Sequence, residues 1–306
     1  MEKIAAEKLV KSATLFSVVL ASFIVIAKLA IWILTDSLSI LSSLVDSSLD
    51  VIASMVNFFA VRYALRPADD DHRFGHGKAE DIAAFAQSAF IMGSGVFIVI
   101  EAIHRFTQPQ PIVNESWGVW LMIVVSFLTV FLVLFQSYVV KKTRSVAVKA
   151  DSIHYKMDLL VNAMVVASLV IVMYSKYYQA DTLIASFIAI YIFKSAWGVG
   201  KEAFDKLMDK EMGDDDRKKI TEAIFSHPKI KGMHDLRTRL SGSTTFIQFH
   251  LEMDKDISLF AAHEISDEIE GKILKIFPHA EIFVHEDIED KEEISLEMGR
   301  VVPAKK

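Results

Sequence analysis

Long apolar runs are the feature that most constrains how this chain of 306 residues can fold. A helix that crosses a bilayer needs about 20 mostly apolar residues. Six segments reach that length, although the last two contain charges: residues 12–34, 38–61, 82–103, 117–140, 146–174 and 180–204. The sequence therefore predicts an α-helical membrane protein with six transmembrane helices in a lipid bilayer, and it excludes a single soluble globule.

Basic residues are distributed unequally between the two sets of loops that these six segments would create. One set, together with the N-terminal segment, carries eleven: Lys3, Lys8, Lys11, Arg62, Arg66, Arg73, Lys78, Lys141, Lys142, Arg144 and Lys149. The opposite set carries two, Arg105 and Lys176. Because cytoplasmic loops of membrane proteins carry the excess of Lys and Arg, we expect both termini to be cytoplasmic.

Charge divides the chain near residue 206, since residues 1–206 have a net formal charge of +1 and residues 207–306 one of −7. The second part has helical periodicity or strand alternation in five segments: residues 214–226, 232–240, 244–253, 260–276 and 281–288. We expect a transmembrane domain at 1–206 and a small cytoplasmic α+β domain of order α-β-β-α-β at 207–290. The charged, aperiodic tail at 291–306 is expected to be disordered.

Composition excludes several classes of function. The chain has no cysteine, so disulfides, thiolate metal sites and cysteine catalysis are ruled out. No region is strongly basic, so we expect no binding to nucleic acid. The segment His263-Glu264-Ile265-Ser266-Asp267 is similar to the HExxH motif of zinc proteases, but aspartate replaces the second histidine. We therefore predict that the protein is not an enzyme.

Ionisable side chains occur inside two of the predicted spans, where each costs about 2.5–3.5 kcal/mol. Asp46 and Asp50 lie in the second span, and His154 and Asp158 lie in the fifth. Each pair is spaced i, i+4, which places both side chains on one helix face. Counted from the span ends, both pairs lie near the middle of a hydrocarbon layer about 30 Å thick.

Three carboxylates and one imidazole at one depth form a four-ligand set that suits Zn²⁺ or a similar divalent ion. The alternatives are buried polar pairs that hold the helices together, or a proton path without metal. A second cluster, Asp69, His72 and His76, lies in the loop after the second span, with its histidines spaced i, i+4. That loop fits a smaller metal site and equally a solvated segment of mixed charge.

Together these motifs resemble the cation diffusion facilitator family, and within it the bacterial YiiP-type zinc transporters, over roughly residues 8–290. The resemblance implies a homodimeric zinc/proton antiporter of the bacterial inner membrane, with three metal sites per subunit. It implies that Asp46, Asp50, His154 and Asp158 form the transport site, and that the loop cluster binds metal. The set of three Asp and one His is similar to the zinc and cadmium branch, and Fe²⁺ is also compatible with these ligands.

Six of the ten histidines follow residue 226, and several could gather around a metal pair. His285 and Asp287 are spaced i, i+2 on the predicted third strand and therefore share a face. The resemblance implies a metallochaperone-like or ferredoxin-like domain with a binuclear zinc site formed by His234, His250, His263, His285 and Asp287. His234 is the weakest member, because alternation places it beside Leu236 and Leu240. Scattered surface histidines are the alternative.

The resemblance also implies a salt bridge between Lys78 and Asp209 that interlocks the two subunits. Zinc binds deprotonated ligands, so its arrival displaces protons, and protons can in turn expel zinc. We therefore predict a Zn²⁺/H⁺ antiporter that alternates access around the midplane site. Two other functions stay open: a passive divalent-cation channel, and a membrane scaffold that senses metal through its cytoplasmic domain.

Overall fold

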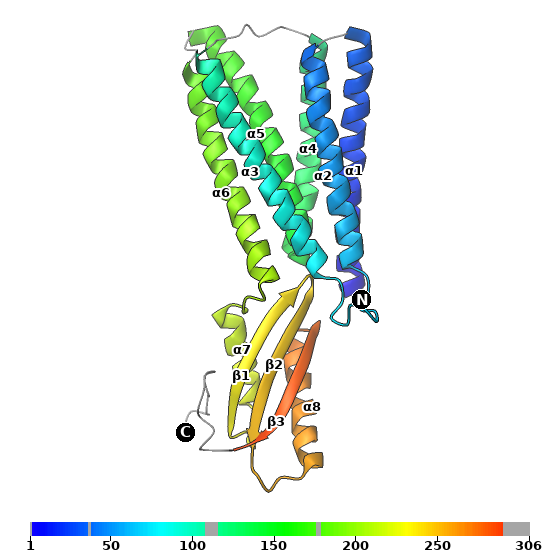
Figure 1. Cartoon of the computed structure of the whole chain (residues 1–306), viewed down its shortest axis with the longest axis vertical. Coiled ribbons are helices and arrows are strands. Elements are labelled where there is room, and N and C mark those ends of the chain that lie inside the picture. The colour runs from blue at the N-terminus through cyan, green and yellow to red at the C-terminus, as the bar shows by residue number, and fades with distance from the viewer. Residues whose placement is uncertain (1, 36–37, 108–115, 176–178, 290–306) are drawn as a thin grey trace. The chain divides into compact units, whose positions relative to one another are not determined.

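The computed structural model describes residues 2–35, 38–107, 116–175 and 179–289, which are coloured in Figure 1. The chain divides into two compact units, residues 1–204 and 205–306. The segment 291–306, expected to be disordered, lies outside the described residues.

Six long helices build the first unit. They are α1 (Glu2–Thr35), α2 (Leu38–Ala64), α3 (Lys78–Thr107), α4 (Ser116–Thr143), α5 (Val146–Ser175) and α6 (Gln179–Leu207). Each apolar run of the sequence lies within one of these helices, and none of them contains a proline, which would interrupt the backbone hydrogen bonds. Among the described residues, two stretches are long and apolar enough to cross a membrane by length and composition, Ile4–Leu34 and Ile123–Thr143.

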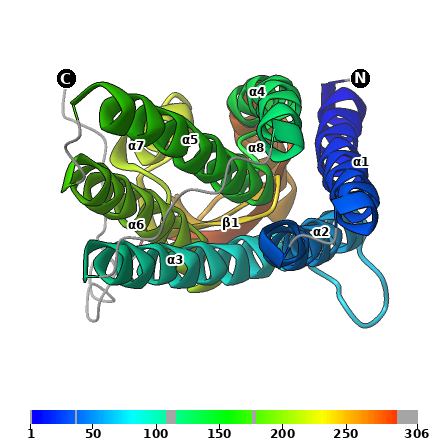
Figure 2. The same ribbon diagram turned by 90° about the horizontal axis from the view of Figure 1, so that it is seen from above.

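The helices of this unit pack in a continuous bundle, in which α1 contacts α2 and α4, and α5 contacts α4 and α3. Figure 2 shows α5 between α4 and α6 when the bundle is seen from above. Small side chains let α3, α5 and α6 approach closely, among them Ala84, Ala150 and Ala203. At Gly200 the approach is so close that a Cβ atom would lie 2.6 Å from Ser88 Oγ.

The second unit has the order α-β-β-α-β that periodicity predicts. Its elements are α7 (Asp214–Ile224), β1 (Gly232–Ser241), β2 (Thr244–Met253), α8 (Leu259–Ile276) and β3 (Ala280–Ile288). The strand order is β1-β2-β3, with β1 antiparallel and β3 parallel to β2. Ser258 caps α8, since its side chain accepts a hydrogen bond from the Ala261 N–H.

One face of the sheet forms the core of this unit with the two helices. Ile247, Phe249 and Leu251 of β2 are buried against Ile220 of α7 and Ile269 of α8. Because side chains alternate along a strand, the intervening residues of β2 and β3 lie on the opposite face. The sheet thus presents its polar residues away from the two helices.

An extra residue in β1 changes which side chains share a face. His234 pairs with His250, but Arg237 pairs with Gln248, so β1 uses three steps where β2 uses two. Asp235 takes up the irregularity with a φ of 51°, in the left-handed region. Regular alternation would place His234 on the side of Leu236, which packs against the core. The bulge places His234 on the face of His250 instead, contrary to what regular alternation predicts.

Candidate metal centres

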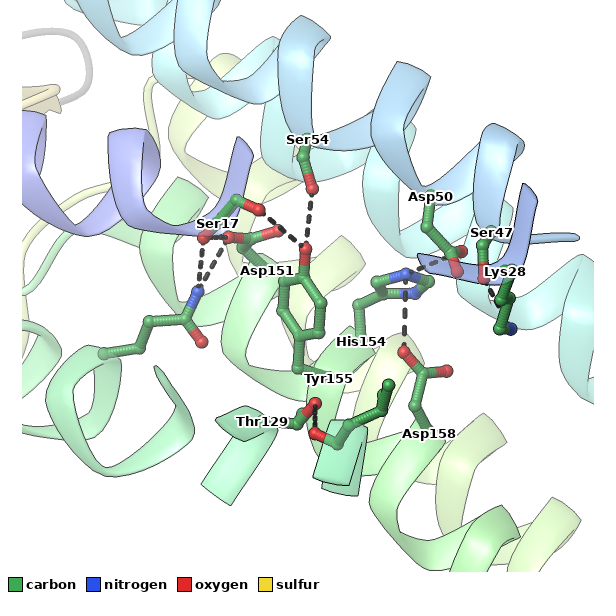
Figure 3. A network of polar contacts seen from close by, with 12 residues as sticks. Ser17, Lys28, Ser47, Asp50, Ser54, Thr129, Asp151, His154, Tyr155 and Asp158 are labelled. Atoms are coloured by element: carbon green, nitrogen blue, oxygen red, sulfur yellow. Dashed lines mark hydrogen bonds and ion pairs between the residues drawn. The ribbon is translucent and has the colours of Figure 1, made fainter. Parts of the chain in front are cut away.

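Asp50 of α2 and the pair His154 and Asp158 of α5 lie together in the first unit. His154 Nε2 is 3.1 Å from Asp50 Oδ1 and 3.9 Å from Asp158 Oδ2. Figure 3 shows the three side chains turned toward one another. Ligand atoms from all three lie within 4.8 Å of one another, a spacing at which one cation could contact them all. Asp46 belongs to α2, but its side chain lies outside what the structure describes.

A cavity of about 320 Å³ adjoins this cluster. Asp50 and Asp158 line it, and their side chains are 28% and 34% exposed, whereas that of His154 is 2% exposed. The carboxylates therefore face the cavity, and the imidazole is buried behind them. Lys28 also lines the cavity, and its Nζ donates a hydrogen bond to Ser47 Oγ at 2.7 Å. In the sequence Lys28 is visible only as an interruption of an apolar run.

A further buried carboxylate lies one helical turn before His154. Asp151 Oδ2 accepts a hydrogen bond from Gln136 Nε2 at 2.7 Å and lies 2.5 Å from Ser17 Oγ. Motif reasoning missed Asp151, although Asp151, His154 and Asp158 have the i, i+3, i+7 spacing of one helix face. Tyr155 adds a link between helices, because its hydroxyl lies 2.9 Å from Ser54 Oγ of α2 (Figure 3).

The loop before α3 brings Asp69, His72 and His76 together. Asp69 Oδ1 lies 3.2 Å from His72 Nδ1, and Asp69 Oδ2 lies 3.2 Å from His76 Nε2. The backbone N–H of His72 donates to Asp69 Oδ1 at 2.7 Å and holds the pKa of this carboxyl below its usual value. The His76 side chain is 3% exposed, and its Nδ1 has no hydrogen-bond partner. An ionised carboxylate between two imidazoles is a suitable ligand set for a divalent cation.

The first turn of α3 connects this loop to α5. The buried Glu80 accepts hydrogen bonds from Ser145 Oγ at 2.5 Å and from the Ala147 N–H at 3.4 Å. Ser145 Oγ in turn accepts from the Val148 N–H at 3.2 Å and caps α5. The helix that carries His154 is thus fixed at its start by a residue that closely follows the loop cluster.

The second unit holds a third cluster on the polar face of its sheet. His234 Nε2 and His250 Nδ1 lie 3.7 and 3.6 Å from Asp287 Oδ2. His234 Nδ1 donates to Glu252 Oε1 at 3.0 Å, a contact that orients the ring and that motif reasoning did not anticipate. The centroid of the His285 ring lies 4.6 Å from that of the His250 ring, with the ring planes tilted by 48°, because the two residues are paired across the parallel strands.

His263 does not join this cluster within one subunit. It lies on α8, which packs against the opposite face of the sheet, and its side chain is 70% exposed. Its Nδ1 is 3.8 Å from Glu286 Oε1. The expectation that His263 gathers with the strand histidines therefore finds no support from the arrangement inside a single chain.

Lys78 and Asp209 belong to different units. Lys78 begins α3, and Asp209 follows α6 with a φ of 54°. Within its own unit, Asp209 Oδ1 lies 3.4 Å from Arg239 Nη1, a pairing that the sequence did not suggest.

Comparison with known families places this geometry in context. Residues 14–208 match the family model described as "Cation efflux transmembrane domain". Residues 212–289 match the one described as "Cation efflux protein, cytoplasmic domain". The chain belongs to the cation efflux family. The family that the sequence motifs indicated is thereby confirmed, and this member is an integral membrane protein with a cytoplasmic domain.

Curated relatives of this cation efflux protein are named as transporters and not as enzymes. It is 44% identical over 280 residues to "Cation-efflux pump FieF" of Yersinia enterocolitica serotype O:8 / biotype 1B, covering 92% of this chain and 93% of the relative. It is also 44% identical over 280 residues to "Cation-efflux pump FieF" of Serratia proteamaculans, with the same coverage. A solved structure, the metal-bound C-terminal domain of the CzcD transporter from Thermotoga maritima, matches 28% of this chain and all of that chain at 25% identity, with a TM-score of 0.25.

Proposed function

We propose that this cation efflux protein is a Zn²⁺/H⁺ antiporter that exports Zn²⁺ from the cytoplasm, with Cd²⁺ and Fe²⁺ as further candidate substrates. The observation that carries the proposal is the convergence of Asp50, His154 and Asp158 from two helices beside a cavity. With Asp46 they supply three carboxylates and one imidazole, a donor set that suits zinc. Acidic groups inside membrane helices typically mark ion pathways.

Exchange follows from competition for the same atoms. His154 Nε2 lies between two carboxylate oxygens, so the three groups together can hold either a proton or a cation. Zinc requires the deprotonated ligands, so its binding releases protons, and protonation releases zinc. A pH difference of one unit supplies about 1.4 kcal/mol per proton. A membrane potential of 100 mV adds about 2.3 kcal/mol per charge moved.

Access would alternate as helix groups rock around the site. The ligands belong to α2 and α5, so a relative movement of these helices would open the site to either side. We propose six transmembrane helices within residues 1–206, a cytoplasmic metal-binding and dimerisation domain at 207–290 and a tail at 291–306. Both termini would be cytoplasmic, in a bacterial inner membrane.

The other two clusters would bind metal without transporting it. Asp69, His72 and His76 would form a loop site. A binuclear zinc site would use His234, His250, His285 and Asp287, with His263 supplied by the second subunit of a homodimer. Lys78 and Asp209 would interlock the subunits. Metal bound to the cytoplasmic domain would act as a sensor of the cytoplasmic zinc concentration, because its binding would change the zinc affinity of the transport site.

Flux through the reconstituted protein tests the proposal. Zinc uptake into proteoliposomes under an imposed pH gradient is measured for the wild type, Asp158→Ala and the control Lys156→Gln. Lys156 is a charged residue of the same helix, but it is exposed and does not line the cavity beside Asp158. We expect gradient-dependent flux in the wild type and the control, and none in Asp158→Ala.

Each other outcome favours a different function. Flux in all three proteins that ignores the pH gradient would contradict antiport and indicate a passive pore, which requires weak binding for throughput. Zinc binding without flux in the wild type would favour a sensor.

A further inference from the structure

Asp151 is a buried carboxyl group that the transport site does not use. It is 1% exposed, and its neighbours Ser17 of α1 and Gln136 of α4 are uncharged. Its Oδ1 atom has no hydrogen-bond partner. A buried carboxylate without a cationic partner is costly, so this environment favours the protonated, neutral form of the group.

The surrounding hydrogen bonds can serve both protonation states of Asp151. Ser17 Oγ lies 2.5 Å from Asp151 Oδ2 and 3.1 Å from the carbonyl oxygen of Ala13, and it has one hydrogen to donate. When Asp151 is ionised, Ser17 donates to Asp151. When Asp151 is protonated, Asp151 donates to Ser17 Oγ, and Ser17 turns its hydrogen to Ala13. Gln136 Nε2 donates to the cluster in both states.

The charges near Asp151 are those of the transport site. The titratable groups that face this region from α5, α2 and α1 are His154, Tyr155, Asp158, Asp50 and Lys28. Among the residues that the structure describes, His154 contacts Asp50 and Asp158, and no hydrogen bond or ion pair joins it or Asp158 to Asp151. Asp151 lies one helical turn before His154, and the two side chains interact electrostatically. A divalent cation held by His154 adds positive charge in this region and therefore favours the ionised carboxylate of Asp151.

We propose that Asp151, with Ser17 and Gln136, is a second proton-binding site of the exchanger. Asp151 holds a proton while the transport site is protonated and releases it when a divalent cation binds one turn away. The O–H bond at Oδ2 breaks, its electron pair stays on the carboxylate, and the proton passes to water in the cavity that Tyr155 lines. The inference rests on the proposed antiport, and it assigns part of the proton stoichiometry to a residue that does not touch the metal.

Counting protons tests the inference. Zinc is added to the purified full-length protein in weak buffer, and the protons released per zinc bound at the transport site are measured with a pH indicator. Asp151→Asn keeps the shape of the side chain but has no proton to release. We expect this variant to bind and transport zinc while releasing up to one proton fewer per zinc. Lys156→Gln, which changes an exposed residue of the same helix and leaves the Asp151 cluster intact, is the control, and we expect it to release as many protons as the wild type.

A second measurement does not require Asp151→Asn to fold. In infrared difference spectra, zinc should remove a protonated-carboxyl band from the wild type. The frequency of that band should differ in Ser17→Ala, since the hydrogen bond from Asp151 to Ser17 is lost. The inference is overturned if Asp151→Asn releases as many protons as the wild type, or if the band is identical in Ser17→Ala. Zinc flux without proton movement in the wild type would instead refute the antiport itself.

Discussion

Glu252 shows how a residue outside the ligand set can decide the geometry of a metal site. Its side chain is 5% exposed and accepts a hydrogen bond from His234 Nδ1, which leaves His234 Nε2 directed toward Asp287. Glu252 fits there because residue 232 is glycine: a Cβ atom at Gly232 would lie 2.4 Å from Glu252 Oε2. The smallest residue of β1 thus keeps the histidine ring in place.

Replacing Gly232 should therefore weaken metal binding at the cluster of His234, His250 and Asp287 in the cytoplasmic domain. In Gly232→Ala the new methyl group displaces Glu252, and we expect the zinc affinity of this site to fall by about 10–100-fold, as for lost partners of metal-bound histidines. Isothermal titration of the full chain measures this, with Asp158→Ala and His76→Ala in the background to silence the other two clusters. Gly271→Ala is the control, because a Cβ there meets nothing within 4 Å. Equal affinities in the two variants would contradict the role of Glu252.

The lowered pKa of Asp69 leads to a prediction about pH. A carboxyl whose pKa lies below its usual 3.8 stays ionised throughout the range in which imidazoles lose and gain protons. Asp69→Asn should therefore reduce the zinc affinity of the loop site by a similar factor at every pH between about 5 and 7. Competition with a zinc indicator, in a background of Asp158→Ala and Asp287→Ala, measures that factor. A loss that shrinks steadily on acidification would show that Asp69 itself titrates there.

Single site residues were predictable from sequence where an i, i+4 spacing occurred in ionisable side chains that are costly to place inside a membrane helix. Asp50, His154 and Asp158 lie at a matched depth, and such groups are costly inside membrane helices unless they contact one another or line a polar cavity. Asp151 escaped notice because its partners, Ser17 and Gln136, are uncharged residues of two other helices. The spacing of Asp151 from His154 and Asp158 placed it on their helix face, but no local pattern marks the long-range hydrogen bonds that hold it.

At the level of elements, α3 and α6 pack closely because the residues at their contact are small. A Cβ at Gly200 would lie 2.6 Å from Ser88 Oγ and 3.3 Å from Ser88 Cβ, so a rotation of the serine cannot fully relieve the contact. Close helix contacts of this kind are typical of membrane bundles, in which small residues let backbones approach.

We expect Gly200→Ala to destabilise the bundle. Overpacking costs about 1–3 kcal/mol, and the better helix propensity of alanine returns up to about 1 kcal/mol of that. Thermal unfolding of the purified protein in detergent measures the net loss. Gly198→Ala, two residues away on the same helix, meets nothing within 4 Å and should be neutral or slightly stabilising. Equal melting temperatures for the two variants would argue against tight α3–α6 packing.

Strand boundaries followed from alternation, but registers did not. Expected strands at 232–240, 244–253 and 281–288 correspond to β1, β2 and β3 within one residue at each end. The bulge between His234 and Arg237 was not foreseen, because it depends on Asp235 adopting a left-handed backbone and not on any pattern of polarity. The sequence therefore predicted the sheet and misassigned the face of His234.

At the level of the whole molecule, the two units have separate cores and separate candidate metal clusters. The apolar cluster of the second unit is formed by residues of that unit, most of them from α7, α8 and the sheet. Loss of the metal site in the cytoplasmic domain should therefore leave the transport site intact.

Asp287→Ala tests whether the metal site of the cytoplasmic domain is coupled to the transport site. We expect maximal zinc flux to stay within about twofold of the wild type, while half-saturating zinc rises about fivefold or more, the lower range of allosteric coupling. Flux is measured in proteoliposomes over a range of zinc concentrations. The control is Glu281→Ala, which removes an exposed acidic residue from the same strand. If the flux depends on the zinc concentration as it does in the control, metal in the cytoplasmic domain does not regulate transport.

The bulge in β1 also has a bearing on how this protein can diverge. Replacing Asp235 with a β-branched residue, which disfavours a positive φ, would favour regular alternation over the unchanged length and turn His234 toward the core, although no candidate ligand would have been replaced. A descendant with such a substitution would keep every histidine of the cluster and lose the arrangement of the site. The identity of residue 235 is therefore as informative about metal binding as the ligands themselves.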